Sequence, residues 1–206
     1  MTTVWRQQHR PDMPPDASAI AEAQALIARA RRPLVITGRI PTSAREPLAQ
    51  FLTSTNAAYL DTGDSRALLP THAGYVPAMR ARTMREADLV ITLGRRLDFQ
   101  LAYGSSAVFS PDARVLRIGR TYAETGENRP ADLEIQADLT STLAALARAA
   151  PTEPDQAWVD SLRTENARRA ANLSTTLTNP PASAEGRMHP YQSQPSTGIS
   201  DTPTGC

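Results

Sequence analysis

The chain has 206 residues, of which 40% are hydrophobic and 21% are charged. This length suits one α/β domain with its own core plus an extension, and it is short for two full domains. The 22 basic and 21 acidic residues leave a formal net charge of +1. We therefore expect neither a nucleic acid nor an anionic membrane surface as a partner.

The cysteine usage and the apolar runs exclude further classes. Cys206, the last residue, is the single cysteine, so the chain has neither an internal disulfide framework nor a thiolate zinc site. Its apolar runs span only a few residues, whereas a bilayer crossing needs roughly 20. Residues 1–10 lack the apolar core of a secretion signal. We expect a cytoplasmic protein without a membrane span.

In chain order, the first predicted element is a helix. Residues 1–15 are polar and rich in proline, so we expect an extended entry segment. Asp16 is a suitable cap for the helix that follows, and Pro33 ends it near Arg31 because the residue before proline avoids the helical conformation. Further strands and helices then alternate. The predicted strands cover residues 33–38, 57–60, 88–94, 114–118 and 132–136, and the predicted helices cover residues 42–54, 77–86 and those that follow Asp138.

Alternating strands and helices imply parallel pairing through right-handed crossovers. We therefore predict the α/β class over residues 16–150, with a doubly wound, mainly parallel Rossmann-like sheet of the NAD/FAD-binding (DHS-like) type. Ligands of such sheets sit beyond the carboxyl ends of the strands. This rule gives the candidate cofactor-binding residues Gly38, Arg39, Gly94, Arg95, Arg96 and Arg120.

The character of the chain changes after Pro151. Residues 151–175 read as a linker and one amphipathic helix, with Trp158 and Leu162 among its apolar members. Residues 176–206 are rich in proline, serine, threonine and glycine, without apolar periodicity. We expect that tail to be disordered.

The sequence contains no recognisable catalytic or metal constellation. The glycines of a dinucleotide fingerprint do not follow Gly38, so an NAD-dependent hydride-transfer enzyme is not expected. His9, His72 and His189 have no partner at metal-ligand spacing. The serines lack a Gly-x-Ser-x-Gly elbow. We assign no catalytic and no metal-binding residue.

Two segments carry a resemblance to a known family. Residues 28–38 read ARARRPLVITG, and residues 85–99 read READLVITLGRRLDF. With residues 111–115 and 128–132 in the same order, they resemble the central domain of thiamine-diphosphate-dependent enzymes of the acetolactate-synthase type. The likeness covers about residues 16–150, and the stretch MHPY at 188–191 is similar to the lead into the family's third domain.

The resemblance implies a parent enzyme, a transferase or lyase, that decarboxylates or carboligates 2-keto acids. Thiamine diphosphate and Mg²⁺ would be bound by N- and C-terminal domains or subunits that this chain lacks. We therefore expect a truncated, non-catalytic central module that is inactive alone. Gly63-Asp64-Ser65 is interpreted as a loop turn rather than a diphosphate site.

In relatives the central domain binds FAD, as in acetolactate synthases, or ADP, as in oxalyl-CoA decarboxylases, or nothing. Relatives often follow the fourth strand with Asp-Ile-Asp, whereas this chain has Arg117-Ile-Gly-Arg120, which weakens a transferred ribose contact. Arg120 either meets a phosphate or is a surface arginine without a ligand. Arg95 and Arg96 have the same two interpretations, and Asp98 is interpreted as a loop cap.

Two other functions stay open. The chain is alternatively a freestanding nucleotide-binding or scaffold protein that pairs with separately encoded domains. The third hypothesis is a gene fragment without function.

Overall fold

The computed structural model describes residues 13–148 and 152–179. The chain divides into two compact units, residues 1–166 and 167–206, and the sheet belongs to the first. Within the described ranges, no helix combines the length and the apolar character that a membrane crossing requires.

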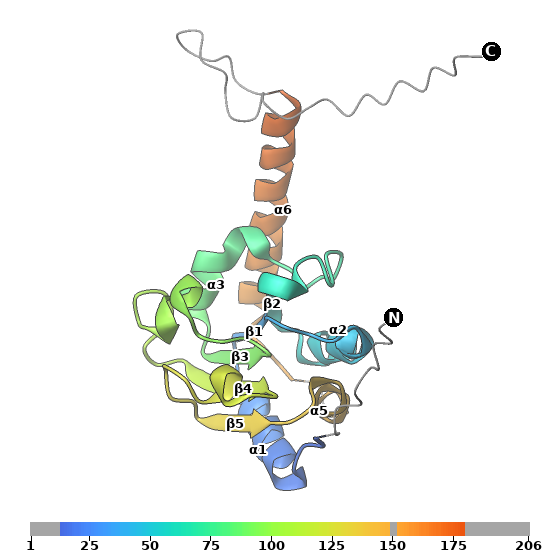
Figure 1. The fold of residues 1–206 in the computed structure, drawn as a ribbon. Coiled ribbons are helices and arrows are strands. Elements are labelled where there is room, and N and C mark those ends of the chain that lie inside the picture. The colour runs from blue at the N-terminus through green and yellow to red at the C-terminus, as the bar shows by residue number, and fades with distance from the viewer. Residues whose placement is uncertain (1–12, 149–151, 180–206) are drawn as a thin grey trace, which may run out of the picture. The chain divides into compact units, whose positions relative to one another are not determined.

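The first unit is built on five parallel strands in the order β2-β1-β3-β4-β5 (Figure 1). The chain first winds outward from β1 to β2, and then returns to the other side of β1 for β3, β4 and β5. The winding direction therefore reverses between β1 and β3, which is the switch point of a doubly wound sheet. The strands are β1 Pro33–Thr37, β2 Ala58–Asp61, β3 Leu89–Leu93, β4 Arg114–Gly119 and β5 Leu133–Gln136.

Helices cover both faces of this sheet (Figure 1), which confirms the predicted doubly wound α/β class. The α-helices are α1 Ala17–Ala28, α2 Arg45–Thr55, α3 Arg80–Glu86, α4 Tyr122–Thr125, α5 Leu139–Leu146 and α6 Gln156–Thr178. The short 3₁₀ segments are η1 Thr42–Ala44, η2 Gly63–Ser65, η3 Pro77–Met79 and η4 Phe99–Gly104.

The sheet separates two hydrophobic cores. One lies beneath α1, α2 and α5, and includes Phe51 and Leu143. The other lies beneath α3, η4 and the first turns of α6, and includes Leu101 and Trp158. Every residue of β1 and β3 is buried, because both faces of these central strands are covered. This burial explains their continuous apolar sequence.

The predicted strands are confirmed to within two residues at each end, whereas several helix details differ. Residues 42–54 and 77–86 begin as 3₁₀ turns before α2 and α3, and Pro77 opens the second turn as expected. The short elements η4 and α4 had no apolar periodicity to reveal them. Helix α6 continues to Thr178, past the predicted start of disorder at 176, and residues 180–206 lie outside the described residues.

The two predicted helix caps differ in outcome. Asp16 does cap α1, since its Oδ1 accepts hydrogen bonds from the backbone N–H of Ser18 and Ala19 at 2.8 and 3.2 Å. Asp138 occupies the N-cap position of α5 but makes no side-chain cap hydrogen bond. Its carboxylate instead accepts from the N–H of Met13 at 2.6 Å. The hydrogen-bond donor to the Asp138 carboxylate is therefore the N–H of Met13 in the entry segment, rather than an N–H of the first turn of α5.

The start of α6 is attached to the core through one tryptophan. Trp158 is 5% exposed, and its Nε1 donates to Glu86 Oε2 at 2.8 Å. We expect Trp158→Ala to lower the free energy of unfolding by about 3–5 kcal/mol in urea titrations, because a large buried side chain is lost. Leu173→Ala, on an exposed position of the same helix, should change it by less than about 0.5 kcal/mol. Equal effects of both changes would contradict this attachment.

Candidate functional site

Two glycines meet where β1 and β3 end. Arg39 N donates to Gly94 O at 2.8 Å, and Gly38 N donates to Leu93 O at 3.0 Å. A Cβ on Gly38 would lie 2.3 Å from Gly94 O, and a Cβ on Gly94 would lie 2.3 Å from Arg39 O. Gly94 also has a φ of +56°, which side chains rarely adopt. The glycines are therefore required for backbone packing at the switch point.

This packing determines what the switch point offers to a ligand. Phosphates in doubly wound sheets are usually held by backbone N–H groups that point out of such a crevice. The N–H groups of Gly38, Arg39 and Gly94 instead donate to carbonyl oxygens of β3 and β4 and of the turn after β3. The predicted role of Gly38 and Gly94 in cofactor binding is not supported by this geometry, and their structural role is.

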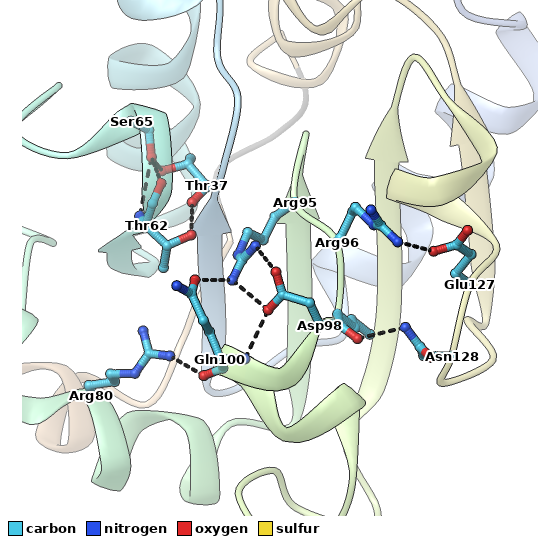
Figure 2. A network of polar contacts seen from close by, with 11 residues as sticks. Thr37, Thr62, Ser65, Arg80, Arg95, Arg96, Asp98, Gln100, Glu127 and Asn128 are labelled. Carbon is cyan, nitrogen blue, oxygen red and sulfur yellow. Dashed lines mark hydrogen bonds and ion pairs between the residues drawn. The ribbon is translucent and has the colours of Figure 1, made fainter.

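Arg95 is directed into the protein. It is 8% exposed and forms a bidentate ion pair with Asp98, with N–O distances of 2.8 and 2.9 Å. Its Nη2 also donates to Gln100 Oε1 at 2.9 Å (Figure 2). Asp98 in turn accepts from Gln100 N at 3.0 Å as the cap of η4, so the cap interpretation of Asp98 is confirmed. Arg95 fixes the turn after β3, and only its buried Nε lacks a partner among the described residues.

Arg96 points away from Arg95 along the sheet edge (Figure 2). Its Nη2 pairs with Glu127 Oε2 at 2.7 Å, and both side chains are partly exposed. Asn128, beside Glu127, donates to Leu97 O at 2.7 Å. Arg96 is therefore tied to the loop between α4 and β5, outside the pocket described below.

Arg80 is a further arginine at this edge, and no motif in the sequence distinguishes it from the other arginines. Its Nη2 donates to Gln100 O at 2.9 Å (Figure 2). Burial lowers the pKa of Arg80, and the charges of Arg95 and Arg66 act in the same direction while Asp98 opposes them. The structure thus brings Arg80 and Arg95, from distant segments, to the two ends of Gln100.

A hydroxyl network closes the carboxyl end of β1. Thr37 Oγ1 lies 2.7 Å from Ser65 Oγ, and Thr62 Oγ1 donates to Thr37 O (Figure 2). Thr37 Oγ1 also lies 3.1 Å from Tyr59 Oη. Burial is the main cause that raises the pKa of Tyr59 to about 12. The segment η2 Gly63–Ser65 is therefore a structural turn held against β1.

A pocket of about 960 Å³ opens where the loops after β1, β4 and β5 meet. It contains apolar surface from Ile40 and Leu139, and hydroxyls from Ser43 and Thr140. Such a mixture suits a small organic ligand with a polar end. The pocket is lined by Pro14, Arg39, Ile40, Pro41, Ser43, Arg120, Thr121, Glu124, Asp138, Leu139, Thr140, Ser141 and Ala144.

Both arginines of the pocket have acidic partners. Arg120 forms an ion pair with Asp138, and both side chains are mostly buried. Arg39 Nε lies 3.2 Å from Asp64 Oδ2, with both side chains largely exposed. An exposed pair of this kind contributes little stability, so a ligand can displace it at low cost. The Arg120–Asp138 pair is less exposed than the Arg39–Asp64 pair and is therefore harder to displace.

The turn after β4 is held by hydrogen bonds between its backbone and the side chain of Glu124. Glu124 Oε2 accepts from the N–H of Arg120 at 2.8 Å and of Thr121 at 3.2 Å. A Cβ on Gly119 would lie 2.6 Å from Glu124 Cβ. The absence of a Cβ at position 119 therefore leaves room for the Glu124 side chain to fold back onto these N–H groups. Glu124 thus places a carboxylate near residues 117–120, where the sequence lacks the Asp-Ile-Asp stretch mentioned above.

The six predicted residues therefore do not form one site. Arg39 and Arg120 share the pocket, whereas the other four serve turns and ion pairs at the edge. Asp138, Glu124 and Thr140 belong to the pocket but were missed or assigned to capping, since only the fold brings their loops together. Among the described residues, no cluster of three or more His, Cys, Asp or Glu side chains is placed to hold a metal ion.

The glycine packing can be tested with a matched pair of substitutions. Gly94 and Gly63 have φ values of +56° and +55°, but a Cβ on Gly63 meets no atom within 4 Å. Gly63→Ala should cost about 1–2 kcal/mol of unfolding free energy from backbone strain alone. Gly94→Ala should cost about 1–3 kcal/mol more, because its Cβ also collides with Arg39 O. Equal losses in denaturant titrations would show that the contact can be relaxed.

Comparisons with known proteins agree with this architecture. The family described as thiamine pyrophosphate enzyme, central domain, matches residues 20–146, more than half of the chain. Oxalyl-CoA decarboxylase of Escherichia coli K12 is 28% identical over 191 residues, covering 87% of this chain and 34% of the relative. The acetolactate synthase large subunit of Parasynechococcus marenigrum is 32% identical over 201 residues, covering 89% of this chain and 30% of the relative.

A solved structure supports the fold itself. The X-ray structure of a protein from Mycobacterium smegmatis, described as a thiamin diphosphate-dependent enzyme, superimposes with a TM-score of 0.59 at 19% identity. The superposition covers 72% of this chain and 30% of that chain. The chain thus spans about a third of the length of the proteins it matches. From the family match and the five-stranded parallel sheet, we conclude that this chain belongs to the family of thiamine pyrophosphate enzyme central domains.

Proposed function

We propose that this chain acts as the non-catalytic central domain of a cytoplasmic thiamine-pyrophosphate-dependent enzyme that decarboxylates or carboligates 2-keto acids. The observation that carries the proposal is that residues at the carboxyl edge of the sheet contact one another. Gly38 and Gly94 pack against each other, and Arg95 is enclosed by Asp98 and Gln100. An edge organised in this way gives a rigid layer against which other domains can pack. Two relatives that match most of this chain are named oxalyl-CoA decarboxylase and acetolactate synthase large subunit.

The described residues do not fit thiamine diphosphate or its magnesium ion. Magnesium prefers several hard oxygen ligands in octahedral geometry. Asp64, in the single turn that resembles a diphosphate motif, pairs with Arg39, and Ser65 is bonded to Thr37 and Thr62. In the proposed function, the flanking domains or subunits of the enzyme therefore supply the cofactor and its chemistry.

The proposal predicts the behaviour of the isolated chain. With pyruvate, thiamine diphosphate and Mg²⁺, the purified 206-residue protein should form no acetolactate in a colorimetric assay. An acetolactate synthase of the same class serves as the positive control. Turnover at about 1 per second or faster, which is ordinary for enzymes, would contradict the non-catalytic assignment.

A second function is favoured by the pocket at the ends of β1, β4 and β5. Its volume of about 960 Å³ falls within the range of small-molecule sites, and Arg39 and Arg120 at its wall suit a phosphate. We propose an adenine nucleotide, ADP or FAD, as its ligand. The same binding would serve a domain of a larger enzyme or a freestanding nucleotide-binding scaffold.

Calorimetric titration with ADP, FAD and NAD tests this second function. One of the adenine nucleotides should bind with micromolar affinity, and Arg39→Ala should weaken that binding about tenfold, since a charged hydrogen bond is lost. Arg96→Ala is the matched control, because Arg96 lies at the same edge but does not line the pocket. Absence of binding by all three ligands, or an equal loss in both variants, would refute this assignment of the pocket.

A further inference from the structure

Two buried side chains on neighbouring strands carry polar atoms without partners. Thr92 on β3 and Arg117 on β4 both have 0% exposure, and the strand register pairs them directly. Paired residues of neighbouring strands project to the same face of the sheet, with strands about 5 Å apart. Within the described part of the chain, Thr92 Oγ1 and the Nε and Nη2 of Arg117 make no hydrogen bond.

The rest of the Arg117 guanidinium meets only neutral groups. Its Nη1 donates to Glu127 O at 2.5 Å and to Arg129 O at 3.4 Å. None of the ion pairs found among the described residues includes Arg117. Glu127 is paired with Arg96 instead, and Glu134, the register partner on β5, is exposed. The part of the chain that the structure describes therefore supplies no ion pair to this fully buried cation.

The electrostatics of Arg117 agree with this description. Burial lowers its pKa, and the charges of Glu134, Glu127 and Tyr122 oppose that shift. A guanidinium nevertheless stays charged in proteins. Buried charges in native proteins are as a rule paired, and buried donors are as a rule hydrogen-bonded.

We infer that a halide ion, chloride under cellular conditions, binds between Thr92 and Arg117. The ion accepts hydrogen bonds from Thr92 Oγ1 and from Nε and Nη2 of Arg117, and it neutralises the buried charge. A water molecule would satisfy the donors but leave the charge without a partner.

The ion would also secure the loop that lies over this face. Arg117 holds the carbonyls of Glu127 and Arg129, and the same loop supplies the partner of Arg96 and the amide that binds Leu97 O. Halide binding should therefore stabilise the folded chain and keep this loop in place. The inference does not depend on the proposed function.

Thermal unfolding of the full chain in chloride or bromide, compared with gluconate at equal ionic strength, tests the site. At about ten times the halide Kd, linkage predicts a rise of roughly 2–5 °C in Tm for the unmodified chain. Thr92→Val, which keeps the shape and removes the hydroxyl, should abolish most of that rise. Thr142→Val removes an equally buried hydroxyl from α5, which also has no hydrogen-bond partner among the described residues, and should leave the halide response unchanged.

Crystals grown in bromide give the direct test. The inference requires an anomalous bromine peak between Thr92 Oγ1 and the Arg117 guanidinium, and loss of that peak in Thr92→Val. An ordered water at this position without anomalous signal would overturn it. A Tm rise in halide that Thr92→Val retains in full would overturn it equally, and would show that the salt acts elsewhere.

Discussion

The backbone contact between Gly38 and Gly94 is the constraint on which the carboxyl edge of the sheet depends. Because neither residue has a Cβ, the turns after β1 and β3 approach closely enough for Arg39 N to bond Gly94 O. The turn after β3 can then send Arg95 inward to Asp98. The crevice that open parallel sheets usually present to a ligand is thereby filled by the protein's own backbone.

With the switch point filled, the free space of the edge lies beside it. The pocket forms between the turn after β1, the turn after β4 and the start of α5. The entry segment contributes as well, since Met13 is bonded to Asp138 in both directions. Asp138 therefore connects the entry segment, the pocket wall and Arg120. A ligand of Arg120 would compete for that arginine with the carboxylate that holds the entry segment.

The opposite face of the sheet shows a different use of arginine. Arg129 donates to the carbonyls of Gly104, Ser110 and Ala113 in the segment between β3 and β4, whereas Arg117 donates to the carbonyls of Glu127 and Arg129 in the loop between α4 and β5. Long guanidinium side chains thus take the place of regular hydrogen-bond ladders in the irregular segments between β3, β4 and β5. This arrangement ties the loops to the sheet and to one another.

The sequence by itself determined the class of fold, because buried parallel strands such as β1 and β3 require continuous apolar runs, and because helices of the right period separate them. It also determined the family, through segments 28–38 and 85–99. Only the tertiary structure decided which of the candidate residues line a pocket and which pack against the rest of the chain. A glycine or arginine after a strand has the same sequence signature whether it lines a pocket, as Arg120 does, or packs against a neighbouring backbone, as Gly94 does. Contacts such as Arg120 with Asp138, or Thr92 beside Arg117, join segments that only the strand order brings together.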